Sequence, residues 1–178
     1  TSVTSSIDFV MDVNGFKGPN SEARNGKQYD IRSFKVARFS NSCPGKELSG
    51  FGCFYVLPSY SPIKAGSEDM KKWDPNWTAE KLKDAFFEHS YLASHDNYWA
   101  GAKKACDDIG MTLPSKSKLY SLYKMSWNNE NLGIPSEGVY WTSSEHEVDL
   151  AWVVDFETDN TDSNYKDKNR YEVICVGK

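Results

Sequence analysis

The hydrophobic period changes from helical to strand-like within the last 80 residues of the chain, and this change constrains the fold more than any other feature. Between residues 97 and 109 apolar side chains recur every three or four positions, which predicts a helix with one buried stripe. The residues of that stripe are Trp99, Ala102, Cys106 and Ile109. From Val139 onwards the period is two, which predicts strands. Helices followed by strands in this order indicate an α+β fold.

Capping residues mark the ends of two predicted helices. Asp96 or Asn97 can cap the start of the first helix, and Gly110 can end it because glycine readily adopts a left-handed conformation. Pro114 blocks any continuation, and Ser115 is the N-cap candidate of a second, short helix. The buried face of this second helix would consist of Leu119, Leu122 and Tyr123.

Two strands are predicted near the C-terminus, separated by a polar interval. Trp152, Val154 and Phe156 alternate with Val153 and Asp155, as in a half-buried strand. A second alternation runs over residues 171–176. Residues 158–169 between them are almost wholly polar, and we interpret them as a long hairpin loop or a solvated, irregular strand pair.

A further helix is expected earlier in the chain. Thr78 can cap a helix that runs to about Tyr91. Its buried face would carry Leu82, Ala85, Phe86 and His89, with His89 as a structural histidine rather than a ligand. Residues 58–76 contain several Pro and Gly residues and are expected to form a connecting loop or a domain boundary.

Five short motifs in the C-terminal half occur in a fixed order. They are the helix with Cys106, Leu113-Pro114-Ser115, Tyr140-Trp141-Thr142-Ser143-Ser144-Glu145, Ala151-Trp152-x-Val154-x-Phe156 and Val173-x-Cys175-Val176. Together they resemble the bacterial domain family with a C-type-lectin-like fold, which includes adhesin C-terminal domains and variable ligand-binding proteins of diversity-generating retroelements. The resemblance implies two helices packed on small antiparallel sheets, within a ligand-binding domain over residues 59–178. Its implied activity is recognition, without catalysis.

The four cysteines are an even number and allow three pairings. Cys43 and Cys53 bracket a short loop, while the resembled family would join Cys106 to Cys175, so we expect the pairs 43–53 and 106–175. The second would close a long loop, worth on the order of 4 kcal/mol in the chain-entropy account. A zinc site is the weaker alternative, because the sequence has no Cys-x-x-Cys and its histidines lack ligand spacing. Disulfides predict an extracellular location, and the resemblance implies that this location is the bacterial cell surface.

Residues 1–58 are expected to form a separate β-segment. Residues 7–13 and 31–39 read as strands, and the run Ile-Asp-Phe-Val-Met-Asp-Val-Asn-Gly-Phe-Lys-Gly-Pro-Asn between residues 7 and 20 resembles the C-terminal β-region of type IV pilin-like proteins. Such proteins carry a long hydrophobic N-terminal helix. Because this chain begins at Thr1 without one, we expect a soluble fragment of an anchored parent, with membrane contact and pilus-like assembly only through the absent helix.

A calcium site is one of two interpretations of the N-terminal Asp-x-Asn-Gly motif. The glycine and the side chains of Asp12 and Asn14 suit a turn, which we favour. The same oxygens, with Asp30, could instead bind Ca²⁺, although the further acidic ligands of an EF-hand are missing. No other cofactor is expected.

Several function classes have little support in the sequence. Nucleophile-elbow, phosphate-loop and zinc-protease motifs are absent, and His146 between two glutamates has no nucleophile to serve as a base. The net charge of −4, without a Lys/Arg cluster, argues against nucleic acid as a partner. No apolar run approaches the roughly 20 residues of a membrane helix.

The most acidic part of the chain, residues 145–178, is the candidate binding surface. It contains nine acidic and four basic residues and is rich in Asn, Asp, Ser and Tyr. One interpretation is a solvated rim that binds nothing. The other is a surface in which Tyr supplies rigid contact area and Asn and Ser supply adaptable hydrogen bonds. The candidate residues are His146, Glu147, Asp149, Asp155, Asn160, Asp162, Asn164, Tyr165 and Asn169.

The sequence therefore predicts an exported, surface-displayed adhesion protein that recognises a protein or glycan on another cell or surface. In the variable proteins that it resembles, the diversified positions lie in the same C-terminal segment. A variable receptor diversified by a retroelement is thus one alternative. A structural minor subunit of a type IV pilus-like fibre is another.

Overall fold

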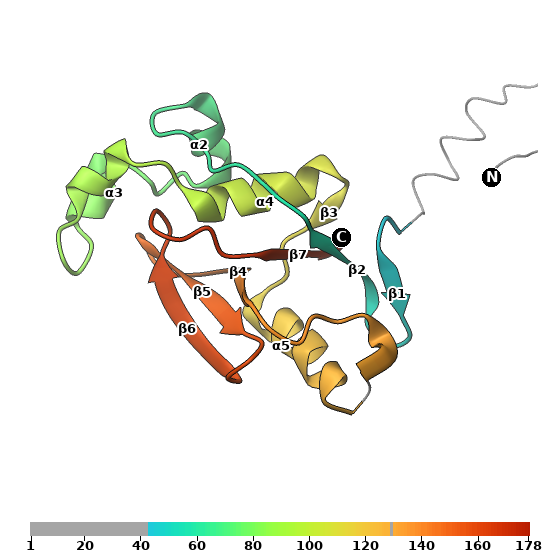
Figure 1. Ribbon diagram of the computed structural model, residues 1–178. Helices are drawn as coiled ribbons and strands as arrows, with labels where there is room; N and C mark the ends of the chain where they lie inside the picture. Colours follow the sequence, from blue (N-terminus) through green and yellow to red (C-terminus); the bar gives the residue numbers. More distant parts are fainter. Residues whose placement is uncertain (1–42, 129) are drawn as a thin grey trace, which may run out of the picture. The chain divides into compact units, whose positions relative to one another are not determined.

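Two small antiparallel sheets organise the residues that the computed structural model describes, 43–128 and 130–178 (Figure 1). The four-stranded sheet has the order β1 (Lys46–Leu48), β2 (Gly52–Leu57), β7 (Val173–Gly177) and β3 (Met111–Thr112). The three-stranded sheet has the order β4 (Val139–Glu147), β5 (Leu150–Asp155) and β6 (Asn160–Tyr165). The helices are α2 (Glu68–Trp73), α3 (Ala79–Lys83), α4 (Tyr98–Asp108) and α5 (Lys116–Met125), with the 3-10 turns η1 (Ser90–Ser94), η2 (Ser126–Asn128) and η3 (Glu130–Leu132). The predicted α+β class is confirmed.

Helices α4 and α5 begin and end close to where their capping residues predict. The Asn97 side chain accepts a hydrogen bond from the backbone N–H of Ala100 at 2.8 Å, so Asn97 and not Asp96 is the cap. Gly110, directly after α4, has a φ of 77°, the conformation that favours glycine. Ser115 accepts from the backbone N–H of Lys118 at 3.2 Å and starts α5.

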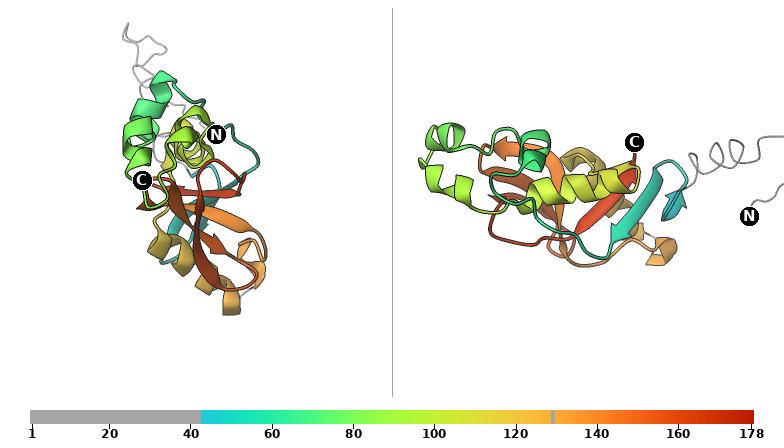
Figure 2. Two further views of the ribbon diagram at one scale, coloured as in Figure 1. Left: turned by 90° about the vertical axis from the view of Figure 1, so that its left-hand side faces the viewer. Right: turned by 90° about the horizontal axis from the view of Figure 1, so that it is seen from above.

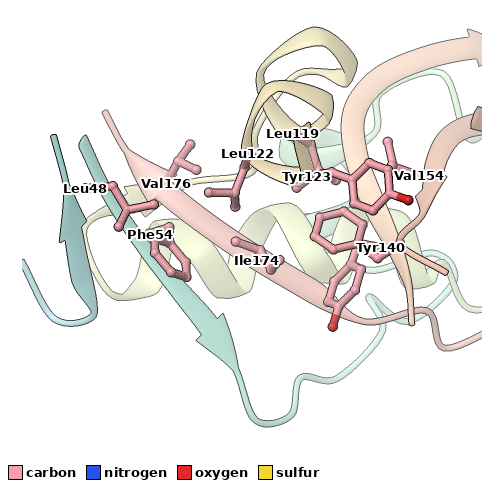
Figure 3. Close-up of a cluster of buried hydrophobic side chains, with 10 residues drawn as sticks. Leu48, Phe54, Leu119, Leu122, Tyr123, Tyr140, Val154, Ile174 and Val176 are labelled. Carbon is pink, nitrogen blue, oxygen red and sulfur yellow. The ribbon is translucent and has the colours of Figure 1, made fainter. Parts of the chain in front are cut away.

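Strand β7 lies in the middle of the core, and both of its faces are buried. Val173 and Cys175 pack with the apolar stripe of α4. Ile174 and Val176 belong to the cluster that includes the buried face of α5, as Figure 3 shows. A strand covered on both faces needs apolar residues at consecutive positions, which explains the run Val-Ile-Cys-Val.

Strand β5 differs from its prediction as a half-buried strand. Val154 packs with α5, but Val153 and Ala151 on the opposite face are buried against the side of α4. Trp152 is the residue of the strand interior that keeps partial exposure. Both faces are covered because the two helices lie on different sides of the sheets.

Both predicted disulfides are present. Cys106–Cys175 ties α4 to β7, and Cys43–Cys53 joins the residues before β1 to β2. The described part of the chain has no free cysteine, so none is left there for a zinc site.

The polar interval after β5 forms a regular strand. Strand β6 pairs with β5 in continuous register, from Leu150 opposite Tyr165 to Asp155 opposite Asn160. It is the edge strand of its sheet, and its first three residues are exposed, which explains why its sequence carries no apolar period.

The first strands of the described part belong to the same sheet as the C-terminal strand. Residues 43–58, assigned by sequence to the N-terminal β-segment, form β1 and β2, and β2 pairs with β7 from Phe54 opposite Val176 to Leu57 opposite Val173. The rest of that segment, with the pilin-like motif and the calcium candidates Asp12, Asn14 and Asp30, lies outside the described residues.

The helix predicted over residues 78–91 is much shorter. Thr78 caps α3 as expected, accepting from the backbone N–H of Lys81 at 3.2 Å, but α3 ends at Lys83. The chain then turns, and Glu88 adopts a φ of 52°, which no helix can contain. Among the described residues, no helix has the length and apolar character needed to cross a membrane.

Candidate ligand-binding surface

The residues predicted to bind ligand lie in separate parts of the β4–β5–β6 sheet. His146, Glu147 and Asp149 lie at or next to the turn between β4 and β5. Asp155 and Asn160 face each other at the other end of the β5–β6 pair, five residue steps or about 17 Å along the strand. Asn169 lies in the connection between β6 and β7, where its amide donates to the Tyr171 hydroxyl at 3.2 Å.

The predicted residues Asp162, Asn164 and Tyr165 of β6 also point to different sides. Because residues directly opposite in an antiparallel pair share a face, Asp162 and Asn164 lie on the face of Val153 and Ala151. Tyr165 lies on the other face. The structure therefore does not bring the predicted set together as one continuous surface.

Several of the acidic residues make internal contacts instead of facing solvent. Asp149 is buried, and its Oδ2 lies 2.7 Å from Nδ1 of His89. Asp167 makes the same kind of pair with His95 at 2.8 Å. Asp155 accepts hydrogen bonds from the backbone N–H groups of Glu157 and Thr158, and these lower the pKa of its carboxyl. These three aspartates therefore stabilise the fold through contacts within the chain.

Three aromatic side chains between α3 and α4 are the most exposed large hydrophobic side chains in the described part of the chain. Phe86 is 81% exposed, Phe87 60% and Tyr91 59%. We call these three residues the aromatic tip. Figures 1 and 2 place α3 at one end of the described unit and β1, where the chain enters the unit, at the other.

The local sequence explains why the tip projects. Ala85 and Leu92, on either side of it, are buried, and Leu92 packs in a cluster with Leu82 and Trp77. The left-handed conformation of Glu88 reverses the chain between these anchors. The two phenylalanines are therefore held outside the core by buried residues before and after them.

A chain of ring contacts supports the aromatic tip. The Phe86 and Phe87 ring centroids lie 4.5 Å apart, and Phe87 stacks on His89 at 5.5 Å. His89 also contacts Tyr91 at 5.7 Å and Tyr165 at 5.6 Å. Since His89 is paired with the buried Asp149, the tip rests on a fixed side chain. Two predicted residues, Asp149 and Tyr165, thus belong to the support of this surface.

The aromatic tip was not predicted, and Phe86 was expected on a buried helix face. The local signal was Phe87, which lies about 100° around a helix from Phe86 and had no place among the predicted buried residues.

Other candidate sites in the described residues are less developed. No group of three or more His, Cys, Asp or Glu side chains there could hold a metal ion. A groove of about 610 Å³ runs between α4 and the segment from Leu57 to Asp69. Of its charged lining residues, Lys104 and Asp108 pair with each other at 3.0 Å, so their charges are already compensated.

Part of the chain matches a known protein family. A family model described as an adhesion domain matches residues 72–176, well over half of the chain. The matched region contains the aromatic tip, α4, α5 and most of the two sheets. No curated protein matches the chain.

Proposed function

Because the chain belongs to the adhesion-domain family, we propose that it attaches a bacterial cell to an external protein ligand through the aromatic tip. Binding is non-catalytic in this proposal, and the chain is displayed outside the cell. The family match and the two disulfides support that location.

The observation that carries the proposal is the exposure of Phe86 and Phe87 on a rigid support. A buried aromatic side chain contributes 150–250 Å² of contact area, and a few such anchors usually dominate the energy of an interface. Leaving two of them in water is unfavourable unless a partner covers them. The His89–Asp149 pair keeps the rings in place before binding, which lowers the ordering cost of association.

The chemistry of the tip favours a protein over a glycan. The phenylalanine rings offer no hydrogen-bonding atom, and they suit an apolar pocket better than a hydroxyl-rich sugar. The hydroxyl groups of Tyr91 and Tyr165 add polar atoms next to the phenylalanine rings. The Lys168 ammonium lies 4.6 Å from the centroid of the Tyr165 ring.

Three finer features belong to the same proposal. The placement of α4 and α5 on opposite sides of small antiparallel sheets supports a C-type-lectin-like arrangement. The exposed start of β6 would accept sequence changes at little structural cost, as a diversified receptor requires. The pilin-like segment, and with it the fibre-subunit alternative, concerns mainly residues that precede the described part.

Beads that carry the full chain provide a test of the function. They would be applied to cultured epithelial monolayers, to plates coated with matrix proteins and to immobilised glycans, beside beads with reduced and unfolded chain. The proposal expects specific retention on a protein surface and loss of retention after protease treatment of that surface.

Two results would contradict the proposal. Retention that survives protease treatment but disappears after enzymatic removal of glycans would replace the protein ligand by a sugar. Equal retention of beads with folded and with unfolded chain on every surface would show that the folded chain has no specific adhesion function.

A further inference from the structure

Lys166 is a charged residue that is completely buried. It follows β6 directly and has 0% exposure. Its Nζ lies 2.9 Å from Asp74 Oδ2, 2.6 Å from Glu145 Oε2 and 2.8 Å from the backbone carbonyl oxygen of Val148. Asp74, just after α2, is also buried. Burying an ammonium and a carboxylate is costly, because both lose their hydration.

The Lys166–Asp74 pair is surrounded by two tryptophan rings and by the side-chain amide of Asn97. The Lys166 nitrogen lies 4.2 Å from the centroid of the Trp99 ring and 5.9 Å from that of Trp77. The buried amide of Asn97 donates to the same Asp74 oxygen at 2.9 Å. Glu145 is partly exposed and is held from the outside by Asn76, whose amide donates to Oε1 at 3.4 Å.

From this arrangement we propose that Lys166 and Asp74 form an intramolecular isopeptide bond, with Glu145 as the proton-transfer residue. An amine, a carboxyl carbon and a second carboxylate meet here, beside two tryptophan rings. This inference is independent of the adhesion function.

The reaction is a condensation that releases one water and needs no co-reactant. Lys166 gives a proton to Glu145, which passes it to Oδ1 of Asp74, and the free nitrogen lone pair then attacks Cγ of the neutral carboxyl group. Negative charge that develops on Oδ2 is stabilised by the Asn97 amide. The bond from Cγ to Oδ1 then breaks, and Oδ1 leaves as water with two protons from the lysine nitrogen, carried by Glu145. Glu145 ends as it began.

Two physical effects favour this step inside the folded chain. Lys166 and Asp74 both lose their hydration on burial, so replacing their ion pair by an uncharged amide is favourable. The fold also holds the nitrogen in contact with the carboxyl group, which replaces a bimolecular encounter by a local movement. The product is a neutral amide, and the cost of a buried ion pair disappears.

The intact mass of the full chain, denatured but not reduced, tests the bond. The expected mass is that of the sequence less the hydrogens of two disulfides and less one water. Tryptic mapping should give one joined peptide pair containing Lys166 and Asp74, because trypsin does not cleave after an acylated lysine. A mass without the water loss, or a water loss confined to one unbranched peptide, would overturn the proposal.

Two matched variants test the role of Glu145. Glu145→Gln keeps the size of the side chain and one of its two acceptor oxygens but cannot carry protons, so this variant should regain the mass of one water and lose the joined peptides. Glu147→Gln changes an exposed neighbour and should keep the bond. A Glu145→Gln chain that still shows the complete water loss would exclude Glu145 as the proton-transfer residue.

Discussion

Asp155 holds the turn between β5 and β6 through a single carboxylate oxygen. Its Oδ1 accepts from the backbone N–H of Glu157 at 2.9 Å and of Thr158 at 3.1 Å. We expect Asp155→Ala to lower the free energy of unfolding by roughly 1 kcal/mol at pH 7, and Asp155→Asn to cost less because it keeps the acceptor. Urea unfolding of the three chains measures the difference.

The same residue predicts a pH dependence. Its pKa is lowered in the folded state from an ordinary value of 3.8, chiefly by the hydrogen bond from Glu157. The contribution of the carboxylate is therefore complete above pH 3.8 and is lost as the pH falls through the lower, folded pKa. The gap between wild type and Asp155→Ala should shrink in acid. A gap that stays constant down to pH 2 would contradict this account of the turn.

Lys103 predicts a pH dependence of the opposite sense. Its Nζ lies 3.6 Å from the centroid of the Trp99 ring, and burial lowers its pKa from 10.5 to about 8. Between these two values the unfolded chain binds more protons, so this lysine makes the folded state gain stability as the pH rises. Lys103→Met should be more stable than wild type at pH 7. Its stability should not show the rise with pH that titration of Lys103 gives the wild type.

Other groups also titrate at alkaline pH and change the stability of both chains. The quantity to compare is therefore the difference in unfolding free energy between Lys103→Met and wild type. The unfolding free energies would be measured at pH 7 and about pH 9.5, with Lys104→Met as the control at the next, partly exposed position, where Asp108 raises the pKa of the lysine instead of lowering it. Parallel pH profiles of wild type and Lys103→Met would show that burial of the ammonium is not costly.

The amino-acid composition of a segment does not predict which of its charged residues face solvent. The acidic character of residues 145–178 was visible in the sequence, but the internal partners of Asp149 and Asp167 were not, because His89 and His95 are 60 and 72 positions away. For the same reason Lys166 in a polar run gave no sign of its burial. Local patterns identify side chains that alternate, and they cannot identify the distant groups that neutralise a charge.

Helix α4 approaches the preceding loop at Gly101. A Cβ atom at this position would lie 2.1 Å from the backbone carbonyl oxygen of Ser61. Alanine favours an isolated helix over glycine by about 1 kcal/mol, yet we expect Gly101→Ala to destabilise the protein by roughly 1–3 kcal/mol because the backbones must separate. Thermal and urea unfolding measure the change. Unchanged or increased stability would contradict this close approach.

The two disulfides should contribute unequally. Cys106–Cys175 spans 69 positions and Cys43–Cys53 only 10, so the first restricts the unfolded chain more. Replacing Cys106 and Cys175 by alanine should cost about 2–5 kcal/mol, and the same change at Cys43 and Cys53 should cost less. Urea unfolding of both double variants measures the order. The reverse order would show that strain or packing, and not loop closure, decides the contribution.

At the scale of elements, helix ends were predicted better than helix lengths. Asn97, Thr78 and Ser115 cap helices because each acts on backbone groups within three residues of itself. The length of α3 depends instead on burial of Ala85 and Leu92 and on the turn at Glu88, which tertiary packing decides. Strand β6 escaped prediction as a regular strand because its position at a sheet edge removes the apolar alternation.

The molecule as a whole separates its binding surface from its most constrained parts. The described unit carries β1 towards one end and α3, which the aromatic tip follows, at the other, as Figure 1 shows. The disulfide Cys43–Cys53 joins β2 to the residues before β1. Between the two ends, α4 and α5 enclose β7. Changes at the tip should therefore alter binding without altering the core.

The central claim is that Phe86 and Phe87 bind the external ligand, and the bead-retention assay tests it most directly with two exposed-aromatic variants. Phe86→Ser combined with Phe87→Ser should reduce retention by about tenfold or more, as expected for interface anchors, and leave the melting temperature within a few degrees of wild type. Trp127→Ser changes another aromatic residue, 53% exposed in η2, and should retain beads as wild type does. Wild-type retention by the double phenylalanine variant would contradict the claim.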